Sequence, residues 1–146
     1  MAETLGSLCD KLTIVKLKQY HSEDSVKLQN LLSQEKNLCD EIDQFLIDAF
    51  SYVVPVHKLT FSANKVYIKE GNEISEITGS IGSVFSKLAQ INCLLWHEQE
   101  KVYEFEKVPI DEKDKVVKNL AILNLERNNC IDKIDKTLKE SIISNV

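Results

Sequence analysis

Glycine and proline are scarce in this chain of 146 residues, which contains four glycines and two prolines. An all-β protein of this length needs many tight turns, and turns are where these two residues concentrate. The sequence therefore argues against a β-rich fold and predicts that helices dominate.

Long apolar runs are missing as well. Nowhere do about 18 apolar residues follow one another, as a transmembrane helix would require. The first residues, Met-Ala-Glu-Thr-Leu, lack the basic segment and the apolar core of a secretory signal. We therefore expect a cytoplasmic protein without a membrane span.

An excess of positive charge is also absent. The chain has 18 basic and 23 acidic residues and a formal net charge of −5, which gives no overall attraction to a polyanion. We therefore expect no nucleic-acid partner.

The four cysteines stand apart, outside any Cys-x-x-Cys pair, and are predicted to be small buried thiols. They are Cys9, Cys39, Cys93 and Cys130.

The familiar enzyme motifs are missing too. The sequence contains no phosphate loop, dinucleotide fingerprint, nucleophile elbow or metalloprotease motif. It therefore indicates no catalytic residues and no cofactor, and it leaves open whether the chain is an enzyme, with the balance toward a non-enzymatic protein.

What the sequence does contain is an internal repeat. Residues 5–12, Leu-Gly-Ser-Leu-Cys-Asp-Lys-Leu, return as residues 81–88, Ile-Gly-Ser-Val-Phe-Ser-Lys-Leu, and each copy is followed nine residues later by a histidine, His21 or His97. A duplicated pair of helices explains this pattern most simply. A second echo links two Asp-x-Ile-Asp segments, at 40–43 and 132–135.

Apolar residues recur at helical spacing along four stretches. These stretches are 4–21, 23–50, about 80–106 and about 112–142. Two helical hairpins with one apolar stripe per helix must bury those stripes against each other. The sequence therefore predicts an all-α fold, a four-helix bundle made of two duplicated hairpins.

The predicted bundle forms a single domain over residues 1–146. Its first repeat covers about 4–50, its second about 80–142, and a long linker of about 51–79 joins them. The linker has the pattern of a small β-hairpin, whose strands would be 59–61 and 66–68. Its simplest role is to cover one end of the bundle.

Lys11 and Lys87 hold equivalent places in the repeat, near helix starts that Thr4 and Ser80 are suited to cap. If the two helix N-termini converge, their amides and these lysines would form an anion site for phosphate or a sugar phosphate. The alternative is structural ion pairs between each lysine and nearby aspartates. The candidates are Asp40 and Asp43 for Lys11, and Asp132 and Asp135 for Lys87.

Each histidine of the repeat has a carboxylate three residues further on. His21 precedes Asp24 and His97 precedes Glu100, and on a helix this spacing points both side chains the same way. The four side chains would give a divalent metal a pseudo-twofold set of ligands. The preferred interpretation is that both histidines are solvated or lie at helix caps.

Polar residues interrupt the apolar stripes of the second hairpin. The last stripe passes through Asn124 and Arg127, Asn92 interrupts the one before it, and the repeat aligns Arg127 with Glu35. An Arg127–Glu35 pair with the two asparagines would form a polar layer that fixes the helix register or lines a ligand pocket. Trp96 is interpreted as core or dimer contact before ligand site.

The segments 92–101 and 124–135 contain an Asn followed by Leu-Trp-His-x-Glu, and then Asn-x-x-Arg-Asn before an isoleucine-rich helix end. In this pattern the C-terminal half of the chain resembles a bacterial helical family of unknown function, whose members are often encoded beside lipopolysaccharide glycosyltransferases. The resemblance implies a role accessory to cell-surface glycan assembly. It marks five positions to test, Asn92, Trp96, His97, Asn124 and Arg127.

Two kinds of function remain open from the sequence. The first is a non-enzymatic helical bundle that acts through protein contacts, with a protein partner or as a homo-oligomer. The second is a bundle that binds or converts a phosphorylated sugar or nucleotide, using the helix-end lysines or the polar layer around Arg127.

Overall fold

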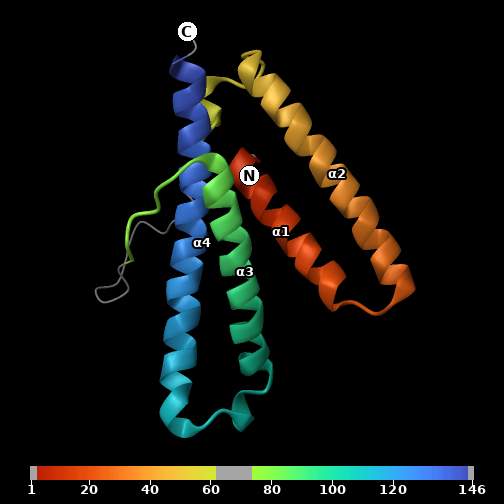
Figure 1. Cartoon of the computed structure of the whole chain (residues 1–146), viewed down its shortest axis with the longest axis vertical. Coiled ribbons are helices and arrows are strands. Elements are labelled where there is room, and N and C mark those ends of the chain that lie inside the picture. The colour runs from red at the N-terminus through yellow and green to blue at the C-terminus, as the bar shows by residue number, and fades with distance from the viewer. Residues whose placement is uncertain (1–2, 62–73, 145–146) are drawn as a thin grey trace.

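Four long helices make up most of the molecule (Figure 1). The structure is a computed structural model that describes residues 3–61 and 74–144. The helices are α1 (Leu5–His21), α2 (Ser25–Phe50), α3 (Ile81–Tyr103) and α4 (Ile110–Ser144), with short 3₁₀ helices η1 (Val56–Lys58) and η2 (Phe105–Lys107). The fold is therefore an all-α four-helix bundle, as predicted.

The predicted β-hairpin of the linker is not supported. Residues 59–61 form no strand, and the second predicted strand, 66–68, lies outside the described residues. Both flanks of the linker instead contribute to the core, because Leu59 is fully buried and Ile77 is 5% exposed.

The two copies of the repeat begin their helices in the same way. Thr4 caps α1 by accepting a hydrogen bond from the Ser7 amide at 3.3 Å, and Ser80 caps α3 by accepting one from the Ser83 amide at 3.4 Å. A hydroxyl cap satisfies an amide that the first helical turn leaves free. The repeat seen in the sequence therefore corresponds to equivalent helix starts in the structure.

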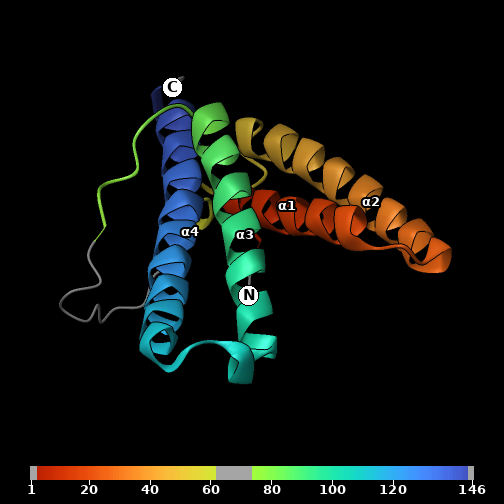
Figure 2. The same ribbon diagram turned by 60° about the horizontal axis from the view of Figure 1, so that its bottom comes forward.

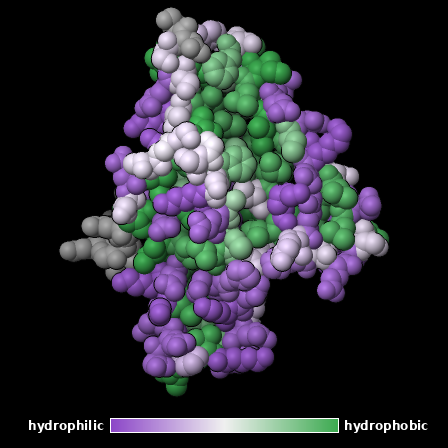
Figure 3. Space-filling view, in the orientation of Figure 1, coloured by the Kyte–Doolittle hydropathy of each residue, from purple (hydrophilic) through white to green (hydrophobic). Residues whose placement is uncertain are grey.

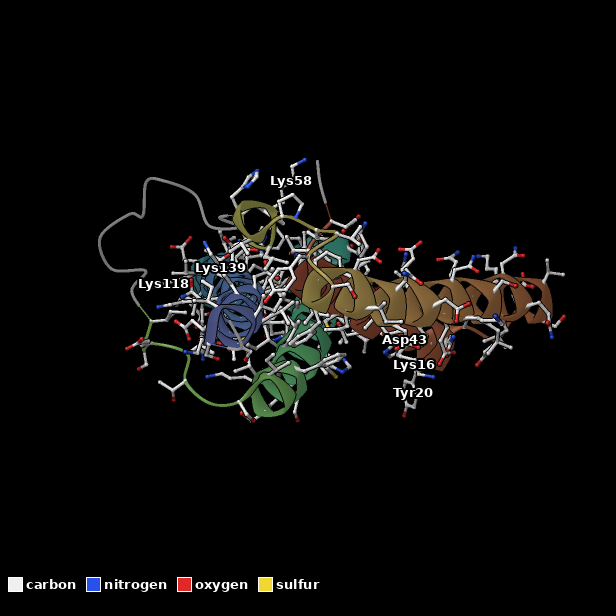
Figure 4. The ribbon with its side chains drawn as sticks, turned by 90° about the horizontal axis from the view of Figure 1, so that it is seen from above. Lys16, Tyr20, Asp43, Lys58, Lys118 and Lys139 are labelled. Carbon is white, nitrogen blue, oxygen red and sulfur yellow. The ribbon has the colours of Figure 1, made fainter. Side chains whose placement is uncertain are left out.

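The two hairpins cross each other instead of lying parallel. α1 runs across the α3–α4 hairpin and packs on both of its helices, whereas α2 packs mainly on α1 (Figures 1 and 2). Seen from above, the outer part of the first hairpin projects as an arm that carries Lys16, Tyr20 and Asp43 (Figure 4). α1 is therefore the central helix of the molecule.

The apolar stripe of α2 is only partly covered as a result. Six apolar residues at helical spacing form this stripe, and two of them, Leu31 and Ala49, are buried. The other four are half-buried: Leu28, Leu38, Ile42 and Phe45. The core proper lies where the N-terminal half of α1 meets α3 and the C-terminal half of α4.

Two of the four cysteines are buried and two are not. Cys9 and Cys130 lie in the core, and burial raises the pKa of their thiols to about 12 and about 11. Cys39 is exposed and Cys93 half-buried, so the prediction of four buried thiols is wrong for these two.

Candidate functional site

A buried polar layer joins three helices. Arg127 of α4 donates two hydrogen bonds to the carboxylate of Asp10 in α1, from Nε to Oδ1 at 2.9 Å and from Nη2 to Oδ2 at 2.6 Å. Asn92 of α3 donates from Nδ2 to the same Asp10 Oδ1 at 2.9 Å and to Thr13 Oγ1 at 2.7 Å. The hydrogen bonds to Asp10 raise the pKa of Arg127 above its usual value. We call these four residues the polar layer.

The polar layer contains two of the four residues that the sequence predicted for it. Asn92 and Arg127 belong to it, but the predicted Arg127–Glu35 pair does not form. Glu35 instead accepts hydrogen bonds from Gln19 at 2.9 Å and Lys16 at 3.0 Å, which lower the pKa of Glu35. The middle of α2 diverges from α4, so Asp10 of the central helix pairs with Arg127 instead.

Asn124 is the other misplaced residue. It is exposed on α4, whereas the extrapolated stripe placed it inside. Asp10 and Thr13 were missed because they lie beside the apolar stripe of α1. Their repeat counterparts, Ser86 and Ala89, carry no charge, so the repeat gave no warning of a buried carboxylate.

A second buried carboxylate lies at the N-terminus of α1. Asp135 of α4 is fully buried, and its Oδ1 accepts a hydrogen bond from the Gly6 amide at 2.7 Å. Thr4 provides a further hydrogen bond to this carboxylate. The N-terminal amides and dipole of a helix attract an anion, and here the anion is a side chain of the same protein.

The predicted anion site is therefore not formed at this helix end. Lys11 points elsewhere, forming an ion pair with Glu3, and Asp40 pairs with Lys36 at 3.0 Å, so the predicted pairing of Lys11 with Asp40 is wrong. Lys87 is exposed on α3.

The buried carboxylate of Asp135 predicts an unusual pH dependence. Burial raises its pKa to about 6, against the opposing effect of the hydrogen bonds from Gly6 and Thr4. A pKa that is higher in the folded than in the unfolded chain means that the folded state binds the proton more tightly. The contribution of Asp135 to stability is thus fully present below about pH 4 and is lost as the pH rises through about 6.

When the pH is lowered from about 7.5 to about 5, we expect the melting temperature of the unsubstituted chain to increase relative to that of an Asp135→Asn variant. Glu3 and Glu35, whose pKa values are lowered, act in the opposite direction in both proteins and cancel in the comparison. Thermal melts followed by circular dichroism at constant ionic strength measure the difference. An equal pH response in the two proteins would show that Asp135 keeps an ordinary pKa.

Four rings meet where the C-terminal end of α1 passes α3. His21 stacks on Trp96 with ring centroids 4.8 Å apart and an interplanar angle of 7°. His97 lies edge-on to His21 at 6.1 Å, and Tyr20 does so at 5.2 Å. We call these residues the ring cluster. The sequence contains a signal for this cluster beyond the two histidines, because the repeat places an aromatic residue directly before each of them.

The four predicted metal ligands are not brought together. Asp24 caps α2 by accepting hydrogen bonds from the amides of Val26 and Lys27, and Glu100 lies 3.9 Å from His97 Nδ1. Within residues 3–61 and 74–144, no group of three or more His, Cys, Asp or Glu side chains is arranged to hold a metal. The two histidines therefore meet, and Glu100 lies near His97, but the four side chains do not form the metal-binding group that the hypothesis required.

An open pocket of about 550 Å³ adjoins the ring cluster at the turn between α1 and α2. We call it the tip pocket, because it lies at the far end of the projecting hairpin. Its lining consists of Lys18, His21, Ser22, Glu23, Asp24, Lys27, Asn30, Leu31, Gln34 and Trp96. It therefore combines ring surfaces with charged and carboxamide side chains.

The structure brings four of the predicted ligand-site residues into the polar layer, the tip pocket and the ring cluster. Asn92 and Arg127 belong to the polar layer, Trp96 lines the tip pocket, and His97 lies beside it in the ring cluster.

In the described part of the chain, no helix is both long enough and apolar enough to cross a membrane. No protein-family model, curated protein or solved structure matches this chain, so these contacts are the basis for inferring its function.

Proposed function

We propose that this chain is a non-enzymatic helical bundle that works through protein contacts, and that the C-terminal end of α2 is the contacting surface. Four large apolar side chains are exposed there: Ile47 by 59%, Phe50 by 46%, Tyr52 by 53% and Val53 by 68%. Clustered apolar exposure of this kind is typical of interaction sites. We call these residues the α2-end patch.

The backbone holds the α2-end patch in a fixed shape. Tyr52 has a φ of 62°, a left-handed conformation that is costly for a residue other than glycine. Asp48 keeps it there, because its carbonyl accepts hydrogen bonds from the amides of Val53 at 2.9 Å and Val54 at 3.2 Å. A rigid apolar surface loses little conformational freedom when a partner binds, which favours binding.

The surroundings of the patch indicate the character of its partner. Hydrophobic surface gathers over the upper half of the molecule in Figure 3, where the C-terminal ends of α2 and α4 lie. Residues 37–50 carry four acidic and no basic side chains. A partner surface with an apolar centre and a basic rim would complement this end.

The alternative function, chemistry at the helix-end lysines or the polar layer, has less support. Lys11 pairs with Glu3, and Asp10 accepts hydrogen bonds from both Arg127 and Asn92. The members of the polar layer bond to one another, as expected of residues that fix the packing of three helices.

A photo-crosslinking amino acid at position 50 tests the proposed contact. We expect a discrete crosslinked product at this position, because Phe50 lies within the α2-end patch. The same probe at Ile110, which is 88% exposed far from the patch, is the matched control. The mass of the product distinguishes a second copy of the chain from another protein. No product at position 50, or equal products at both positions, would contradict the proposal.

A further inference from the structure

Two lysines of the first hairpin form no ion pair within residues 3–61 and 74–144, and both line the tip pocket. Lys11, Lys16 and Lys36 each pair with a carboxylate. Lys18 and Lys27 form no ion pair with any residue in the described part of the chain, and they come from the two helices on either side of the turn. Ammonium groups that have no carboxylate partner are available to an anion.

The acidic residues of the tip pocket do not cancel this charge completely. The carboxylate of Asp24 accepts hydrogen bonds from the amides of Val26 and Lys27, at 2.9 and 3.3 Å, as the cap of α2. Those bonds take up Oδ1 and place part of its charge against the positive end of the helix dipole. Glu23 is the other acidic residue in the lining, and it is exposed to solvent.

The remaining walls are suited to a planar ring. His21 and Trp96 both line the pocket and stack nearly parallel on each other, which leaves one face of each ring for contact with a further planar ring. Asn30 and Gln34 lie four residues apart on α2, and both line the same space. Each carboxamide offers a donor and an acceptor, the groups that pair with the edge of a nitrogen heterocycle.

We propose that the tip pocket binds a phosphate monoester that carries a planar ring, as a nucleotide does. Lys18 and Lys27 would hold the phosphate, and the ring would pack beside Trp96. A volume of about 550 Å³ is within the range of small-ligand sites. The inference goes beyond the proposed function and uses other residues, because the α2-end patch lies at the opposite end of α2.

The single tryptophan of the chain makes the test direct. Trp96 lines the tip pocket and is the only tryptophan in the sequence, so a change in its fluorescence reports occupancy of this site. Titration with AMP should give a saturable change, whereas adenosine, inorganic phosphate and glucose 6-phosphate should each bind at least about tenfold more weakly. A Lys18→Gln/Lys27→Gln variant should lose at least about tenfold in affinity for AMP.

The matched control is a Lys11→Gln/Lys36→Gln variant. It removes the same charge from the same hairpin, but from lysines that already have carboxylate partners, so AMP binding should be unchanged. The proposal is overturned if AMP gives no saturable change, if both double variants respond alike, or if inorganic phosphate or glucose 6-phosphate binds as tightly as AMP. Thermal melts establish that each variant is folded, and the crosslinking at position 50 is unaffected by any of these outcomes.

Discussion

Replacing Arg127 with methionine is expected to lower the free energy of unfolding by about 3 kcal/mol. The substitution leaves the Asp10 carboxylate, whose side chain is 6% exposed, with Asn92 as its remaining side-chain partner in the described part of the chain. A buried charge that loses its counter-charge destabilises the folded state by several kcal/mol. The Arg127 side chain is 31% exposed, so some water can replace it, which places the loss at the lower end of that range. Urea denaturation measures the change.

A second substitution separates the charge from the packing. Asp10→Asn in the Arg127→Met chain removes the uncompensated charge, so the double variant should be more stable than Arg127→Met alone. Additive losses would instead show that Asp10 and Arg127 do not interact. Glu35→Gln serves as the control, because its partner Lys16 is exposed, and it should cost less than about 1 kcal/mol.

The polar layer has a structural consequence that an apolar core would not. Its members come from α1, α3 and α4, and each must reach the others for the buried groups to be satisfied. Sliding or rotating α1 by one residue would break these bonds together, whereas apolar side chains tolerate such shifts more readily. The layer therefore fixes how the first hairpin sits on the second.

The elements of the fold could be predicted because their signals are local. The helical spacing of apolar residues and the hydroxyl caps Thr4 and Ser80 depend only on residues close by in the sequence. The repeat can likewise be recognised by comparing the two segments directly. Asn92 and Arg127 were found in the same way, because they interrupt apolar stripes, but the same signal was wrong for Asn124, which is exposed.

The arrangement of the hairpins could not be predicted in this way. The apolar stripe of each helix defines one buried face, but it does not determine the angle at which two hairpins cross. Because α1 is contacted by three helices, positions away from its stripe are buried as well, including Gly6, Asp10 and Thr13. A bundle of parallel hairpins would place the middle of α2 against α4. The sequence therefore predicts Glu35 as the partner of Arg127, a position that Asp10 takes in the structure.

The two glycines of the repeat should respond oppositely to alanine. In Gly6→Ala, the new Cβ would overlap the carbonyl oxygen of Ile131 and lie 2.9 Å from Asp135 Oδ1. A backbone oxygen cannot move aside cheaply, so α1 must shift away from α4, which also weakens the hydrogen bond from the Gly6 amide to Asp135. We expect the free energy of unfolding to fall by about 3 kcal/mol.

Gly82 is the repeat counterpart of Gly6 and the matched control. It holds the same place in the first turn of α3, but a Cβ there has no neighbour within 4 Å among the residues that the structure describes. Alanine has a higher helix propensity than glycine, so Gly82→Ala should stabilise the protein by about 0.5 to 1 kcal/mol. Urea denaturation of both variants measures whether the free energy of unfolding falls for Gly6→Ala and rises for Gly82→Ala. If Gly6→Ala were also stabilising, the first turn of α1 would not be packed against α4 in solution, because helix propensity alone favours alanine at both positions.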